Sequence, residues 1–199
     1  MAKGSSDIIL RDRLQFDIDA SGDTALVYGR VDFSDYVSIP ENKGLAIKEI
    51  RFQLRTTTGT VGAWPLNMLA NNIAADARAD LKIFATTTAY ENANDVGIAS
   101  PNVISIMELQ STYATPNTTL PPADRQQNLV TRTTHYGTPD LHPEGYDVVT
   151  DLLIGIVLND CNNAVLTDTT AELDVMIICE PKKITQKDLT QMLTQAQDL

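Results

Sequence analysis

The first segment of the chain with a clear pattern alternates apolar and polar residues. Within residues 7–19, one set of alternate positions carries five apolar side chains, and the other set is mostly charged or amide. The apolar set is Ile8, Leu10, Leu14, Phe16 and Ile18. Because side chains of a strand point alternately to its two faces, this segment is predicted to be a strand with one buried and one solvated side.

The same alternation recurs and predicts further strands. After a turn at residues 20–23, a second alternating segment is expected to form a hairpin with the first strand or to lie beside it. Its predicted buried face consists of Ala25, Val27, Val31 and Phe33. Residues 148–158 are almost entirely apolar, which indicates a strand covered on both faces in the middle of a sandwich. The other predicted strands span residues 45–58, 80–87, 102–109, 128–134 and 173–180.

Two segments depart from the strand pattern. Between residues 66 and 78, apolar residues recur at three- and four-residue spacing, which predicts a short helix. Residues 111–125 contain Pro116, Pro121 and Pro122 without any periodicity, which predicts a long loop. Long loops in compact domains are usually functional surfaces or interface elements, so this loop is a candidate contact region.

The C-terminal segment has the pattern of an amphipathic helix. Thr185 followed three residues later by Asp188 is typical of the capping box that begins a helix. Apolar residues then recur at helical spacing, namely Leu189, Met192, Leu193 and Ala196. Their stripe has to cover either the sandwich of the same chain or a neighbouring subunit.

We therefore divide the chain into a sandwich domain, residues 1–184, and a C-terminal helix that acts as an interface arm, residues 185–199. Leu189, Met192 and Leu193 are the predicted interface residues. The fold class is all-β: eight to nine strands with irregular spacing predict a two-sheet antiparallel sandwich. A Cys-Trp-Cys pattern is missing, which argues against an immunoglobulin domain and favours a jelly roll.

Composition narrows the function classes. The 199 residues carry a net charge of −11, and the 15 Lys and Arg residues are scattered rather than clustered. Direct binding of nucleic acid needs a basic groove or arm, so we do not expect it. No apolar run approaches the roughly 18 to 20 residues of a membrane span. The first residues lack the apolar run of a signal peptide, so the chain is expected to be made in a cytoplasm.

Candidate metal and redox chemistry is sparse. His135 and His142 are separated by a segment with Gly and Pro, which is unlike the close ligand spacing of zinc motifs. Asp160 and Asp168, with Asn162 and Asn163 between them, offer oxygen ligands for calcium, but turn formation explains them better. Cys161 and Cys179 are expected to be free thiols, with a disulfide as the open alternative. We expect no cofactor and no metal.

Candidate catalytic chemistry is also sparse. Asp32 and Asp35 lie close together, as a pair of glycosidase carboxylates would, but a solvated turn explains them too. No nucleophile elbow, phosphate-binding glycine loop or dinucleotide motif is present. Trp64 is expected to be a packing residue. The chain is therefore predicted not to be an enzyme.

The layout of the chain resembles that of single jelly-roll viral capsid proteins, above all those of small tailless icosahedral viruses. The resemblance lies in the early alternating strand, the segment VDFSDYV at residues 31–37, the long strand at 43–58 and the proline-rich loops. The last strand, residues 173–180, also runs through Ile184 and Thr185 into a short helix.

Membership of that family implies a self-assembling shell subunit in the virion, in contact with copies of itself and with other capsid proteins. Many such proteins carry a basic N-terminal arm, whereas only Lys3 precedes the first strand here. This departure implies that an internal membrane, another protein or counterions face the genome.

Three hypotheses follow from the sequence. The first is a structural virion protein without catalytic activity. The second is a carbohydrate- or surface-binding β-sandwich module that uses loop aromatics such as Tyr113, Tyr136 and Tyr146. The third is a small acidic hydrolase that uses Asp32 or Asp35 and needs one carboxyl of raised pKa in a concave pocket.

Overall fold

The computed structural model describes residues 7–69, 77–114, 128–136 and 145–195. This part of the chain contains nine strands, one short 3-10 turn (Ala93–Asp95) and one helix, α1 (Gln186–Gln195). The strands are β1 (Ile8–Ile18), β2 (Thr24–Val31), β3 (Lys43–Thr56), β4 (Arg78–Thr86), β5 (Val103–Ala114), β6 (Asn128–Tyr136), β7 (Tyr146–Val148), β8 (Leu152–Asn159) and β9 (Thr169–Lys183).

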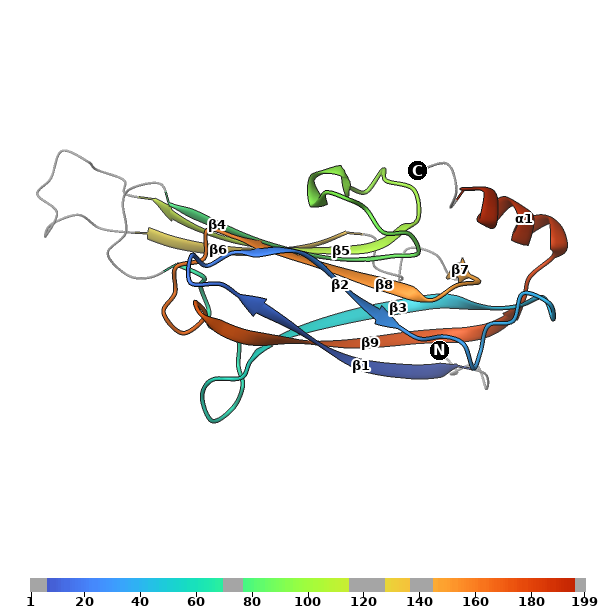
Figure 1. Cartoon of the computed structure of the whole chain (residues 1–199), viewed down its shortest axis with the longest axis horizontal. Coiled ribbons are helices and arrows are strands. Elements are labelled where there is room, and N and C mark those ends of the chain that lie inside the picture. Colours follow the sequence, from blue (N-terminus) through green and yellow to red (C-terminus); the bar gives the residue numbers. More distant parts are fainter. Residues whose placement is uncertain (1–6, 70–76, 115–127, 137–144, 196–199) are drawn as a thin grey trace, which may run out of the picture.

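The strands form two antiparallel sheets that lie face to face (Figure 1). One sheet has the order β1-β9-β3-β7, and the other has the order β2-β8-β4-β5-β6. Only the β4–β5 and β5–β6 connections stay within one sheet; every other connection crosses to the opposite sheet. This nesting of early and late strands is the order of a jelly roll, so the predicted fold class is confirmed.

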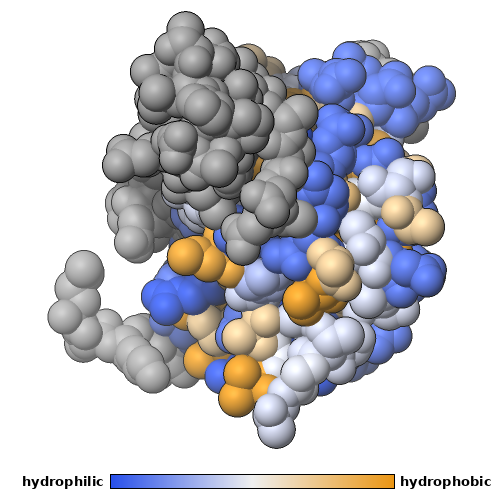
Figure 2. Space-filling view, turned by 90° about the vertical axis from the view of Figure 1, so that its left-hand side faces the viewer, coloured by the Kyte–Doolittle hydropathy of each residue, from blue (hydrophilic) through white to orange (hydrophobic). Residues whose placement is uncertain are grey.

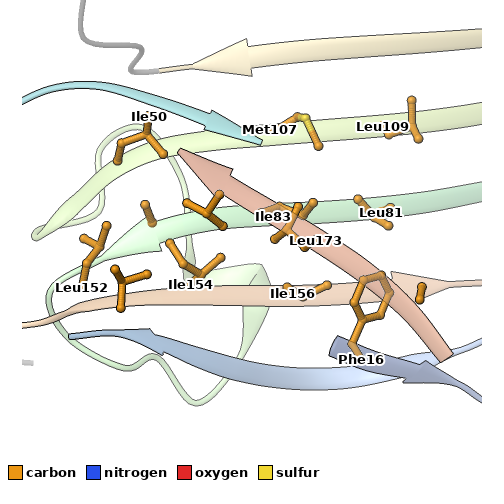
Figure 3. Close-up of a cluster of buried hydrophobic side chains, with 14 of the residues drawn as sticks. Phe16, Ile50, Leu81, Ile83, Met107, Leu109, Leu152, Ile154, Ile156 and Leu173 are labelled. Atoms are coloured by element: carbon orange, nitrogen blue, oxygen red, sulfur yellow. The ribbon is translucent and has the colours of Figure 1, made fainter. Parts of the chain in front are cut away.

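The core consists of the inward rows of both sheets. On β9, Leu173, Val175 and Ile177 are buried at alternate positions, as the alternation predicted. They belong to one buried cluster with the inward residues of the five-stranded sheet, and Figure 3 shows Leu173 over Ile83 and Ile156. Each fully buried Leu, Ile or Phe contributes about 1.5 to 3 kcal/mol, so this interior holds the sheets together.

The expected pairing of the first two strands is wrong. β1 pairs with β9 along its whole length, from Ile8 opposite Cys179 to Ile18 opposite Thr169, whereas β2 pairs with β8. β2 instead lies across from β1 in the other sheet, where a Cβ atom on Gly29 would come within 2.4 Å of Leu14. Each of the two strands therefore pairs with a strand that is distant in the sequence, and the two pack against each other across the sandwich.

The predicted buried face of β2 is half correct. Val31 and Phe33 are buried, but Ala25 and Val27 are exposed. The pairing of β2 with β8 shifts register between Thr24 and Val27. The extra residue puts Thr24 rather than Ala25 on the buried face, which a strict period of two cannot anticipate. Val27 stays in phase with Val31, opposite Ile156, and is 38% exposed at this edge strand.

Three further segments differ from the predictions. Of the predicted helix at 66–78, residues 66–69 are irregular, Arg78 already belongs to β4, and 70–76 lie outside the described residues. The predicted loop at 111–125 begins later, because β5 continues to Ala114, and 115–127 are not described. The expected strand at 148–158 is split between β7 and β8, which belong to different sheets.

The C-terminal helix begins as predicted. The Oγ1 atom of Thr185 accepts a hydrogen bond from the backbone N–H of Asp188 at 3.2 Å, and its hydroxyl lies 2.6 Å from the carboxylate. Leu189 is buried against Val149 and Ile184 of the same chain, and Met192 is half-buried there. The apolar stripe therefore covers its own sandwich at Leu189.

Two predictions concern this helix, namely its interface role and the absence of a membrane-spanning helix. The interface role of Leu189, Met192 and Leu193 stays a prediction, and the side chain of Leu193 lies outside the described residues. No helix in the described part of the chain is long and apolar enough to cross a membrane.

Candidate assembly surface

Three connections at one end of the sandwich form a single ordered surface, which we call the loop cap. They are the β1–β2 turn (residues 19–23), the β3–β4 connection as far as it is described (57–69) and the β8–β9 loop (160–168). All three lie at the left-hand end of Figure 1.

The β1–β2 turn is fixed to the β8–β9 loop by hydrogen bonds. The backbone N–H of Cys161 donates to the carbonyl oxygen of Gly22 at 3.1 Å, and that of Asp168 donates to the carbonyl oxygen of Asp19 at 3.1 Å. The N–H of Asp160 also donates to the Asp23 carboxylate at 2.7 Å. These bonds satisfy the polar backbone of both loops and fix their relative position.

The β8–β9 loop is in turn fixed to the β3–β4 connection. The carbonyl oxygen of Met68, a fully buried residue, accepts from the backbone N–H groups of Asn162 and Asn163 at 3.0 and 3.1 Å. The side-chain amide of Asn163 donates to the carbonyl oxygen of Asn67 at 2.9 Å. The N–H of Met68 itself donates to the Ser111 hydroxyl on β5 at 3.1 Å. The loop cap is therefore anchored in the sheet beneath it.

Large apolar side chains project from this anchored surface. Leu66 is 84% exposed, Val61 is 81% exposed and Val165 is 49% exposed. The loop of Val165 is bonded through Asn163 to Asn67, the neighbour of Leu66, and the carbonyl oxygen of Val165 accepts from the Thr58 hydroxyl at 3.5 Å. Figure 2 faces this end and shows apolar groups among polar ones. Exposed apolar patches on a rigid frame indicate a contact surface.

The charged residues of the loop cap are all acidic. Its three segments contain no Lys or Arg, whereas the turn and the β8–β9 loop carry Asp19, Asp23, Asp160 and Asp168. Two of these carboxylates accept backbone hydrogen bonds within the loop cap, namely Asp19 from Ser21 and Asp23, and Asp23 from Asp160. The surface is therefore apolar with an acidic rim.

The two cysteines lie in the interior as free thiols, so the expectation of free thiols is confirmed. Cys161 is a buried residue of the loop cap, and burial raises the pKa of its thiol. Cys179 lies within β9, where burial raises its pKa to about 11. A thiol that stays protonated is a poor nucleophile, so both act as small packing residues.

A concave surface lies elsewhere, on the outer face of the five-stranded sheet. It is a trough of about 730 Å³ between the β4–β5 connection and β6. Lys82 holds that connection over the sheet through hydrogen bonds to the carbonyl oxygens of Ala93, at 3.0 Å, and Val96. Asp80 lies on the floor, bonded to Gln110 at 2.8 Å and paired with Arg78 at 2.6 Å. Lys82, Asp80 and Gln110 are thus paired within the trough, whose lining also carries Glu91, Arg132 and Asn159.

The sequence-based view that basic residues are scattered needs a correction. β1 and β3 flank β9, and their outer faces carry Arg11, Arg13, Arg51 and Arg55. Asp174 on β9 lies between them, 2.6 Å from Arg13 and 3.4 Å from Arg55. The hydrogen bond from Arg13 is the largest cause that holds the pKa of Asp174 below its ordinary value. This face is an ion-pair ladder in which acids offset the arginines.

The hydrolase hypothesis fails on its own criterion. Asp32 and Asp35 are both exposed. The backbone N–H of Ser34 donates to the Asp32 carboxylate at 2.8 Å and lowers the pKa of that group, where a general acid would need a raised pKa. The pair is a solvated turn.

The other sequence candidates are spread over the molecule. His135 is exposed on β6, and His142 lies outside the described residues. Asp160 and Asp168 both have positive φ angles, 58° and 56°, as expected of turn residues. Within the described residues no group of three or more His, Cys, Asp or Glu side chains could hold a metal ion.

The aromatic candidates are equally dispersed. Tyr136 is on β6 and Tyr146 is on β7, and both are partly exposed. The side chain of Tyr113 lies outside the described residues. Trp64 is half-buried with its ring centroid 6.5 Å from that of Phe16, so it packs as predicted.

The loop cap is the surface that the sequence analysis missed. Val61, Leu66 and Val165 stand in segments rich in Gly, Thr and Asn, which predict loops but do not place distant loops together. A large apolar residue inside such a turn segment was the signal that could have pointed to them. The three loops form one surface only because β1, β3 and β8 end at the same side of the sandwich.

The fold and this surface define the class of the protein: a jelly-roll β-sandwich domain with apolar loops presented at one end. Neither a protein-family model nor a curated protein matches this chain.

Proposed function

We propose that this chain is a structural virion protein, a self-assembling capsid subunit without catalytic activity. The observation that carries the proposal is the jelly-roll strand order combined with a rigid loop cap that exposes Val61, Leu66 and Val165. Loops at one end of a sandwich meet the loops of neighbouring subunits when copies are arranged around a rotation axis with these ends toward it. A pre-ordered frame lowers the cost of association, because its loops do not have to be ordered when copies meet.

The partners in this proposal are other copies of the chain and other capsid proteins. The protein is made in the host cytoplasm and ends up in the virion. Arg13, Arg51 and Arg55 of the four-stranded sheet form ion pairs with acids of the same sheet, namely Asp174, Glu172 and Glu49. This pairing supports the view that an internal membrane or another protein, rather than this chain, faces the genome.

Solution mass and electron microscopy test the proposal. Static light scattering should give a mass many times that of the 21.7 kDa chain, and negative-stain images should show closed particles. A monomer at high concentration and at all salt concentrations would contradict a capsid role.

Charged variants test the loop cap itself. Leu66→Asp and Val165→Asp should lower the assembled mass while the thermal unfolding midpoint stays within a few degrees of wild type. Both residues are exposed, so their replacement does not disturb the core. Ile39→Asp is the matched control, because Ile39 is 41% exposed in the β2–β3 connection at the opposite end. Equal loss of assembly in all three variants would show that the loop cap is not the contact.

The trough on the five-stranded sheet supports a second candidate, a carbohydrate-binding module. Its lining offers amides and charged groups that hydrogen-bond hydroxyls, together with Tyr136 as an apolar surface. Binding of a glycan by a stable monomer on a glycan array would favour this candidate. Loss of that binding in Gln110→Ala would place the ligand in the trough.

A further inference from the structure

The four edge strands of the two sheets differ in how open they are to another strand. The sheet orders leave β1 and β7 at the edges of one sheet, and β2 and β6 at the edges of the other. A free edge presents unpaired N–H and C=O groups, so proteins normally protect it against pairing with another chain.

β1 is protected by charge. Asp12 stands in the inward-facing row between Leu10 and Leu14, opposite Val175. A strand added beside β1 would enclose this carboxylate next to the core, which is costly for an unpaired charge. An inward charge on an edge strand is a known means of blocking pairing.

β2 and β7 are protected by shape and length. The pairing of β2 is irregular between Thr24 and Val27, and such a bulge twists an edge away from a flat partner. β7 consists of only three residues, Tyr146–Val148, which is too short to hold another strand.

β6 has none of these protections. It spans nine residues, Asn128–Tyr136, without Gly or Pro, and pairs with β5 without any register shift. Its sequence is rich in Thr, Val and Tyr, which favour strands. Neither face of its second half is covered: Thr133 and His135 are exposed on the side of the core, and Arg132 and Tyr136 are exposed on the other side.

We propose that β6 pairs edge to edge with β6 of a second copy of this chain, antiparallel and centred on Thr133, so that the two five-stranded sheets become one sheet of ten strands. This inference rests on the proposed function, since it names one of the contacts between copies. The partner is another copy because the strand is complementary to itself in this register.

The register follows from symmetry and side-chain chemistry. Paired residues of antiparallel strands point to the same face, so the two-fold axis passes through a residue rather than between two residues. Centring on Arg132 would place two like charges opposite each other, which is destabilising. Centring on Thr134 would leave Val130, which is 57% exposed, without a cross-strand partner on β6.

Centring on Thr133 avoids both problems. Val130 of each copy then lies opposite Tyr136 of the other copy. The same pair therefore forms twice, and both exposed apolar residues of the strand are covered. Pairs of an aromatic and a β-branched residue stabilise antiparallel sheets, as do pairs of threonines. Arg132 faces a threonine, Thr134 of the second copy, instead of another charge.

A single cysteine at the axis tests the pairing. In Thr133→Cys the two copies of the new cysteine would lie directly opposite each other, with Cα atoms about 4.5 to 5.5 Å apart. This separation fits a disulfide, and mild oxidation should give a covalent dimer on non-reducing electrophoresis. Cys161 and Cys179 are buried, so they do not compete. Cysteine is close to threonine in size and Thr133 is exposed, so we expect the variant to fold.

Thr131→Cys is the matched control on the same face of β6. Its two cysteines would be about 13 Å apart, four residues along the strand at about 3.3 Å per residue, and should stay reduced. Equal crosslinking of both variants would overturn the proposed register. No crosslinking of Thr133→Cys would overturn the edge pairing, including the case in which another part of the same chain covers β6.

The wild-type mass separates the two proposals. If the wild type assembles and Thr133→Cys stays reduced, only the edge pairing fails. If the wild type is a monomer and Thr133→Cys stays reduced, both fail. If the wild type is a dimer and only Thr133→Cys crosslinks, the edge pairing holds and the capsid role fails.

Discussion

A Cβ atom on Gly22 would lie 1.4 Å from the carbonyl oxygen of Cys161, and the carbonyl oxygen of Gly22 accepts the N–H of the same cysteine. The β1–β2 turn and the β8–β9 loop therefore touch through their backbones, with no room for a side chain. Gly22 also has a φ of +89°, where other residues are strained. This contact sets the position of the loop cap.

Gly22→Ala should destabilise the protein by more than about 2 kcal/mol, because it adds a backbone clash to the cost of the left-handed conformation. Gly59→Ala is the matched control: its φ is +84°, but nothing lies within 4 Å of an added Cβ. It should cost only about 1 kcal/mol. Urea unfolding measures both, and equal losses would mean that the loops move apart freely.

Leu189→Ala should detach helix α1 without unfolding the sandwich. Leu189 is the buried contact of the helix with Val149 and Ile184, and removing it costs about 2 to 3 kcal/mol of docking free energy. A short isolated helix is marginal in water, so it should fray once detached. Limited proteolysis should then cut after residue 184, while thermal unfolding of the sheets changes little.

Thr190→Ala serves as the control for that experiment, because Thr190 is exposed and its hydroxyl donates to the Gln186 carbonyl oxygen of its own helix. It should remain resistant to protease. Equal cleavage of both variants, or none in Leu189→Ala, would show that Leu189 does not hold the helix.

Assembly should increase with salt concentration. Each chain carries a net charge of −11, and the loop cap adds an acidic rim around its apolar residues. Salt screens this repulsion between copies without weakening apolar contacts. Light scattering between about 0.05 and 1 M salt checks the trend, with Debye lengths falling from over 10 Å to about 3 Å. Dissociation by salt would instead indicate contacts made by ion pairs.

Asp174 should contribute to stability in a pH-dependent way. The hydrogen bond from Arg13 and its positive charge lower the folded-state pKa of Asp174 below its ordinary value of 3.8. The stabilisation is thus fully present above pH 3.8, where the unfolded chain is also ionised, and is lost as the pH falls through the folded-state value. The stability difference between wild type and Asp174→Asn should shrink below pH 3.8.

Arg13→Gln should flatten the acid limb of the stability profile in the same way, because it removes the group that lowers the pKa of Asp174. Urea unfolding at a series of pH values between 3 and 7 provides the measurement. A difference between wild type and Asp174→Asn that does not change with pH would contradict this ion pair.

Alternation predicted most strands because each side of a strand faces one environment. In β1 and β9 this holds residue by residue, and Leu173, Val175 and Ile177 are buried as expected. The pattern failed where one residue shifts the register, as between Thr24 and Val27 in β2. It also failed at residues 66–69, where Met68 and Leu69 are buried beneath the loop cap without forming a helix.

Among the candidate sites, only the capping box of α1 could be predicted locally, because Thr185 and Asp188 interact within one turn. The loop cap depends on partners more than 40 residues away, such as Cys161 for Gly22, and the open edge of β6 depends on which strands of both sheets pair. The sequence by itself determined which segments extend and which side of each is apolar, since these follow from local periodicity. Only the tertiary structure decided which strands are neighbours, which loops meet and which edge stays open, because these depend on how distant segments exclude water together.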